Sequence, residues 1–202
     1  MARRQTKHTW ILILGGIFTL VLVGVTLALD TLYAPVDGAI RAGALLGYLC
    51  VFLASLSSLY MRELARYFGR PFIKLHHIVA VTGLVALTLH ALGVAWRASS
   101  LNVFLPDFAS VWGFFALGGR PAFWLIAVAA LTALLRKAIG QRWKLIHWLN
   151  YLAFVLGTIH AQMIGTSFEH LGVRLVSGAM LLALVGIFAQ KRIHDRRRAA
   201  KK

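Results

Sequence analysis

Long apolar segments alternate with short polar connections over almost the whole chain. A helix needs about 20 apolar residues to cross a hydrocarbon core that is about 30 Å thick. The fourth segment is shorter than the others, but Pro121 and Arg136 bracket it. The pattern predicts six membrane-spanning helices, at about residues 9–29, 40–61, 75–96, 121–135, 145–165 and 172–190.

The composition indicates a membrane protein, because 59% of the 202 residues are hydrophobic and 14% are charged. We therefore expect an all-α fold: an integral membrane six-helix bundle of residues 9–190, between an N-terminal tail (1–8) and a basic C-terminal tail (191–202). The first apolar segment follows basic residues, as in a signal peptide. It is longer than the apolar core of such a peptide, and no clear cleavage site follows, so we interpret it as a retained helix.

The net charge of +16 comes from basic residues that the six-helix arrangement places on one side. Because Lys and Arg accumulate in cytoplasmic loops, both termini are expected in the cytoplasm and the chain in the cell (inner) membrane. This placement favours contact with anionic membrane lipid, and we expect no nucleic-acid partner. Only four of the 22 Lys and Arg residues fall on the outer side: Arg41, Arg97, Arg120 and Arg174.

Four histidines interrupt the apolar segments in two pairs of similar spacing. His76 and His90 are 14 residues apart in the third segment, and His147 and His160 are 13 apart in the fifth. Ionisable residues at membrane depth are costly and mark functional sites. Fourteen residues return to within about 40° of the same helix face, about 21 Å along the axis. Thirteen leave a mismatch of about 140°, which would need a local π-bulge or two sites rotated relative to each other.

The third and fifth predicted helices run parallel, so their histidines pair by depth. His76 and His147 lie near the cytoplasmic side, and His90 and His160 lie near the outer side. Paired imidazoles at two depths are typical of b-type cytochromes. We therefore expect bis-histidine heme sites between helices 3 and 5, with two hemes b: the inner iron held by His76 and His147, the outer by His90 and His160. His77 is the alternative inner ligand, and the helix-face argument favours His76.

Two further features limit the chemistry of the chain. Cys50 is its only cysteine, so no disulfide forms within the chain, and no C-x-x-C-H motif attaches heme covalently. No dinucleotide-binding motif occurs and the predicted cytoplasmic loops are short, so any flavin must come from a partner.

The outer connection of residues 97–120 is apolar but too short and too interrupted to span a membrane. Its aromatic residues recur at helical spacing, which predicts a short interfacial helix. The alternative is a cap over an outer cofactor or a docking surface. The aromatic residues are Phe104, Phe108, Trp112 and Phe115.

At these histidines the chain resembles the ferric reductase-like transmembrane domain family, over about residues 10–190. That family includes the membrane cores of NADPH oxidases and ferric reductases, and the MsrQ-type heme b subunit of periplasmic methionine sulfoxide reductases. The run Arg142–His147, followed by Tyr151, is similar to the family motif R-W-x-x-[LI]-H-x-x-x-Y. Arg120-Pro121 is similar to the MsrQ type, although such chains tend to have arginine at the position of His76. The resemblance implies that the four histidines named above bind heme.

These observations together predict transmembrane electron transfer by an electron-transfer subunit of an oxidoreductase system. The expected donor is a cytoplasmic flavin reductase or a quinol, and the expected acceptor is a periplasmic reductase or a small molecule at the outer face. Two imidazoles saturate the iron, so electron transfer is favoured over chemistry at the metal. The alternatives are a ferric- or oxygen-reducing heme core, a quinone-linked cytochrome b subunit, and a heme-free channel or transporter that relays protons.

Overall fold

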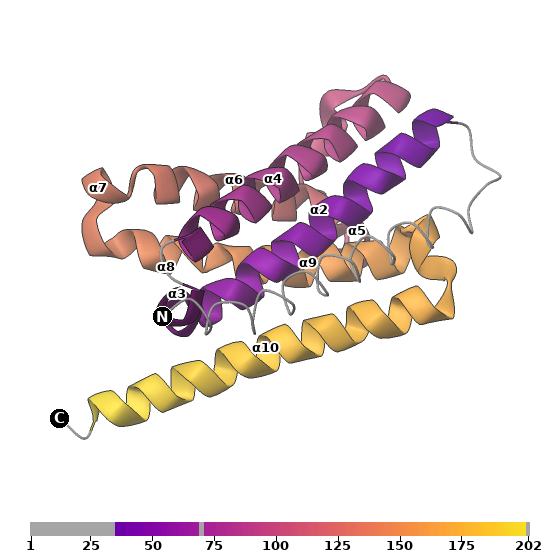
Figure 1. Cartoon of the computed structure of the whole chain (residues 1–202). Helices are drawn as coiled ribbons and strands as arrows, with labels where there is room; N and C mark the ends of the chain where they lie inside the picture. The colour runs from indigo at the N-terminus through magenta and orange to yellow at the C-terminus, as the bar shows by residue number, and fades with distance from the viewer. Residues whose placement is uncertain (1–34, 69–70, 201–202) are drawn as a thin grey trace. The chain divides into compact units, whose positions relative to one another are not determined.

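A computed structural model describes residues 35–68 and 71–200 of the chain (Figure 1). The described part is helical and contains no strand. It divides at Gly93 into two compact units, one up to that residue and one from Val94 onward. The predicted helix at 9–29 lies outside the described residues. The all-α prediction is confirmed for the part of the chain that the structure describes.

The first unit contains an antiparallel pair of long helices, α2 (Pro35–Leu59) and α4 (Pro71–Arg97), with the short α3 (Met61–Phe68) between them in sequence (Figure 1). Glycines bring the long helices close together. A Cβ added at Gly47 would come within 2.6 Å of the Leu87 side chain, and one at Gly83 within 2.8 Å of Cys50 Cβ. Small residues at such contacts allow close helix packing without a polar driving force.

The second unit is built around α6 and α9, which pack against each other in antiparallel register. A Cβ added at Gly118, just before α6, would lie 3.0 Å from the carbonyl oxygen of Leu156 in α9. At Gly140 the backbone adopts a positive φ of 67°, which glycine tolerates, where the chain reverses between α6 and α9. The helices of this unit are α5 (Val111–Ala116), α6 (Gly119–Leu134), α7 (Arg136–Ile139), α8 (Trp143–His147), α9 (Leu149–Ile164) and α10 (Leu171–Ala199).

The long C-terminal helix α10 packs along α9 through an aromatic cluster (Figure 1). The ring of Phe188 lies 4.6 Å from that of Tyr151 and 5.8 Å from that of Trp148, measured between centroids. The guanidinium of Arg192 lies 4.7 Å from the centroid of the Trp148 ring. A cation over an aromatic face adds to the packing, so this cluster fixes α10 to the start of α9.

Three described helices are long and apolar enough to cross a membrane: Pro35–Leu59, Phe72–Arg97 and Leu171–Arg197. Helix α6 and the segment Arg136–Ile164 pass the same test only together, as a broken span bent by 79°, which would bring the number to four. Five of the six predicted segments are therefore helical. The long apolar helices among them support the prediction that this is a membrane protein. The six-span arrangement and its topology stay predictions.

The outer connection contains a 3₁₀ turn (Leu101–Phe104) and the short helix α5. Ser110 caps α5, since its hydroxyl accepts a hydrogen bond from the backbone N–H of Gly113 at 2.9 Å. The indole N–H of Trp124 donates to the carbonyl of Phe104 at 2.7 Å and ties the turn to α6. A short helix is thus present, but it contains only Trp112 and Phe115 of the four aromatic residues, because the chain is not helical between Phe104 and Ser110. Its position at a membrane interface stays a prediction.

Candidate functional site

His90 is held against the neighbouring helix by one ring nitrogen. Its Nδ1 lies 3.0 Å from the backbone carbonyl oxygen of Ile40 in α2. The close approach of the two helices makes this contact possible, since a Cβ at Gly43 would lie 3.1 Å from the carbonyl oxygen of Ala86. A carbonyl can only accept, so Nδ1 carries the proton and the lone pair of the neutral ring is on Nε2.

His76 has the same tautomer through a different acceptor. Its Nδ1 lies 3.0 Å from the Ser57 hydroxyl oxygen, and that hydroxyl donates its proton to the carbonyl of Ala54 at 3.0 Å. Because a hydroxyl has only one proton, Ser57 accepts from Nδ1–H of His76. The lone pair is again on Nε2.

His77 differs from His76 in its surroundings. It is exposed, and its ring centroid lies 5.8 Å from that of His76. His76, in contrast, is half-buried and contacts α2 through Ser57. This difference agrees with the expectation that His76 is the inner ligand, which stays a prediction.

The two histidines of the second unit repeat this arrangement. His147 Nδ1 lies 3.2 Å from the carbonyl oxygen of Ala129 in α6. His160 Nδ1 lies 2.6 Å from the carbonyl oxygen of Ala116 at the end of α5. In all four predicted ligands, Nδ1 therefore lies within hydrogen-bond distance of an oxygen on another helix, and at His147 the Asn150 side-chain amide also lies 3.4 Å from Nδ1. Metal-bound histidines almost always donate their second ring nitrogen in this way, to a carbonyl or a carboxylate.

The ring of His160 lies directly against the first residue of α6. A Cβ added at Gly119 would be 2.9 Å from both Nε2 and Cδ2 of this ring. Gly118 likewise allows a close approach of α9, since a Cβ there would lie 3.0 Å from the carbonyl oxygen of Leu156. The two glycines before Arg120 thus allow the His160 side chain to reach the carbonyl of Ala116.

The backbone between His147 and His160 departs from the regular α-helix, but in the direction opposite to the predicted π-bulge. The helix breaks at Trp148, whose N–H bonds to the carbonyl of Leu145 at 3.2 Å, while Tyr151 N–H bonds to the carbonyl of Trp148 at 2.9 Å. These i to i−3 bonds are of the 3₁₀ type, with about 120° per residue rather than 100°. A tightened turn adds rotation, so it reduces the mismatch of the 13-residue spacing, which a π-bulge would increase.

The predicted pairs join different units, since His76 and His90 belong to the first and His147 and His160 to the second. The pairing by depth therefore stays a prediction. Among the residues that the structure describes, no three His, Cys, Asp or Glu side chains form a metal-ion site. A bis-imidazole iron needs only two such ligands.

Sequence reasoning did not identify Ser57 or the three backbone acceptors. The Ser57 hydroxyl had a weak signal, as one of three serines at the end of the apolar second segment. No protein-family model, no curated protein and no solved structure matches this chain. The resemblance to the ferric reductase-like family therefore rests on the quoted residues alone.

Proposed function

We propose that the chain is a six-helix, heme-binding electron-transfer protein of the membrane. His76 and His147 would hold an inner heme b, and His90 and His160 an outer one. The observation that carries this proposal is the common arrangement of the four imidazoles: each has Nδ1 within hydrogen-bond distance of an oxygen on a neighbouring helix, which would leave Nε2 as the atom that binds iron. When bound, each heme would supply a reversible one-electron centre.

The same hydrogen bonds argue against the heme-free alternative. A proton relay needs groups that both accept a proton and pass it on. Three of the four Nδ1 atoms bond instead to the backbone carbonyls of Ile40, Ala116 and Ala129, which cannot pass a proton on. The contacts orient the rings and leave Nε2 as the basic atom, as a metal ligand requires.

The spacing along α4 supports two layers. This helix is continuous from Pro71 to Arg97, so its histidines lie about 21 Å apart along the axis at 1.5 Å per residue. That is most of a hydrocarbon core of about 30 Å. One ligand would therefore serve each half of the membrane. Electrons would enter from a cytoplasmic flavin reductase or a quinol and leave to a periplasmic reductase or a small acceptor.

Heme content tests the proposal directly. We expect about two hemes b per chain by pyridine hemochrome assay of the purified protein, and a content near zero would refute the cytochrome function. The control variant His77→Ala should retain both hemes, since its ring is exposed.

Double variants test which histidines share an iron. If His90 and His160 share one, the combined His90→Ala and His160→Ala variant loses only one heme. His90→Ala combined with His147→Ala should lose both, because each change removes a ligand from a different site. The reverse result would show that the pairing by depth is wrong.

A further inference from the structure

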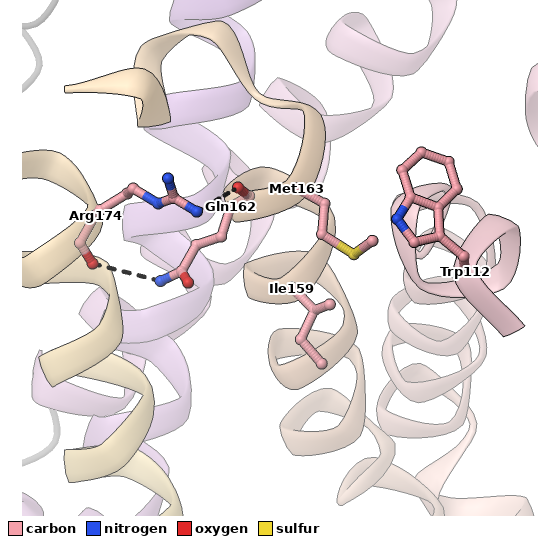
Figure 2. Close-up of a pocket in the computed structure, with 5 residues that line it drawn as sticks. All are labelled: Trp112, Ile159, Gln162, Met163 and Arg174. Atoms are coloured by element: carbon pink, nitrogen blue, oxygen red, sulfur yellow. Dashed lines mark hydrogen bonds between the residues drawn. The ribbon is translucent and has the colours of Figure 1, made fainter. Parts of the chain in front are cut away.

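A pocket of about 280 Å³ lies in the second unit, at the C-terminal end of α9 (Figure 2). It has one polar wall and one apolar wall. The lining residues are Trp112 of α5, Ile159, Gln162 and Met163 of α9, and Arg174 of α10. We propose that this pocket binds an anionic phospholipid, with the phosphate at Arg174 and an acyl chain along the apolar wall. The inference rests on the proposed membrane location of the chain and does not depend on heme.

The polar wall is held in place by bonds between α9 and α10. The Gln162 side-chain amide donates to the Ser177 hydroxyl at 3.0 Å and to the Arg174 carbonyl at 3.4 Å, and the Ser177 hydroxyl donates to the same carbonyl at 2.9 Å. Figure 2 shows Gln162 and Arg174 facing each other across this junction. The start of α10 is thereby fixed relative to α9, so the arginine is presented from a defined position.

Arg174 provides the charge that recognises an anion. Its guanidinium makes one long bond, 3.4 Å from NH2 to the carbonyl of Gln162, although the group carries five N–H donors. The side chain is exposed, no described carboxylate forms an ion pair with it, and none of the lining residues is acidic. Guanidinium groups bind phosphate through paired hydrogen bonds. The pocket thus favours a phosphate over a neutral or cationic group.

The apolar wall selects a ligand with a hydrocarbon chain. Met163 points toward Trp112 in Figure 2, and the Trp112 side chain is 66% exposed. Ile164 and Leu175, each next in sequence to a lining residue, are also exposed apolar side chains. A free anion would gain nothing from this surface, whereas a lipid would cover it. In the proposed topology the end of α9 and the start of α10 lie at the outer face, where tryptophan and lipid head groups meet.

Lipid titration of the purified, delipidated chain in a neutral detergent tests the proposal. Native mass spectrometry with phosphatidylglycerol and phosphatidylcholine measures the apparent affinity for each lipid. We expect selective binding of phosphatidylglycerol, weakened about tenfold or more in Arg174→Gln, because a hydrogen bond to a charged group is lost. Arg174→Lys should bind with intermediate affinity, since it keeps the charge without the paired donors.

Arg97→Gln is the matched control, because it removes one positive charge from the same proposed side and should keep the selectivity. Equal binding of the two lipids, or unchanged selectivity in Arg174→Gln, would overturn the proposal. Competition by millimolar inorganic phosphate that abolishes lipid binding would show a free-anion site instead. Heme content measured on the same samples separates a failure of this inference from a failure of the proposed function.

Discussion

Replacing Gly119 by alanine would place a methyl carbon 2.9 Å from both Nε2 and Cδ2 of the His160 ring. Non-bonded carbon atoms rest about 3.5–4.0 Å apart, so the ring must move by roughly 0.6–1 Å. The bond from His160 Nδ1 to the carbonyl of Ala116 is short, at 2.6 Å. A shift of that size would lengthen it to the limit of a hydrogen bond or break it.

Two effects on stability oppose each other in Gly119→Ala. Alanine favours the helix over glycine by about 1 kcal/mol in a helix interior, and by less at the first residue of α6. Forcing an extra methyl group into a packed contact costs about 1–3 kcal/mol. We therefore expect a net loss of stability together with a displaced His160. In the heme-bound protein the outer low-spin signal in electron paramagnetic resonance should be lost or shifted, with the inner signal unchanged.

Gly157→Ala is the matched control, because a Cβ added at this position of α9 meets no atom within 4 Å. It should leave both heme signals intact and keep or raise the melting temperature. If Gly119→Ala behaves like this control in both measurements, the His160 ring is not constrained as the structure indicates. If Gly119→Ala is destabilised but keeps a normal outer heme, His160 is a packing residue and the ligand assignment is wrong.

Two further variants test the first unit. Ser57→Ala removes the acceptor of His76 Nδ1–H, which makes the imidazole a weaker donor to ferric iron. Because the ferric state is then less stabilised, the midpoint potential of the inner heme should rise in a potentiometric titration. An unchanged potential would exclude His76 as the ligand of that heme. Gly83→Ala places a Cβ 2.8 Å from Cys50 Cβ and should lower the melting temperature, and combining it with Cys50→Gly should restore that temperature. Gly186→Ala is the control, because a Cβ there meets no atom within 4 Å and should not lower the melting temperature. If the double variant is not restored, the contact between Gly83 and Cys50 does not set the distance between the helices.

The helices were predictable because their signal is carried by many residues. The apolar character of a segment does not depend on its neighbours, so five of the six predicted segments appear as helices. The end of the last one was wrong, because α10 continues nine residues beyond residue 190, to Ala199, into the predicted basic tail. The break at Trp148 was not predictable, since the run from Trp143 to Tyr151 contains neither Gly nor Pro. Its tightened turn follows from backbone bonds that no residue type in the run requires.

The candidate ligands were predictable for a different reason: a histidine inside an apolar segment is conspicuous on its own. Their acceptors were not, because Ile40, Ala116 and Ala129 contribute only a backbone carbonyl, which every residue possesses. Only the packing of one helix against another decides which carbonyl faces a ring. Glycines in the sequence indicate that two helices pack closely, but the sequence alone does not show which residue of the neighbouring helix each glycine contacts.

The register of the helix pairs explains why Ser57 differs from the other acceptors. In the second unit the accepting residues Ala116 and Ala129 are 13 positions apart, as are the histidines that bond to them. In the first unit the histidines are 14 positions apart, and 14 residues after Ile40 comes Ala54.

The carbonyl of Ala54 is the group to which the Ser57 hydroxyl donates. The serine therefore lies between His76 and the carbonyl that the antiparallel register assigns to it. This inserted hydroxyl is polarised by the Ala54 carbonyl, and it is the one acceptor among the four that a side-chain substitution can remove. In the proposed two-heme protein, a side-chain substitution could therefore change the potential of the inner heme through Ser57, whereas the other three histidines contact backbone carbonyls that a substitution leaves in place.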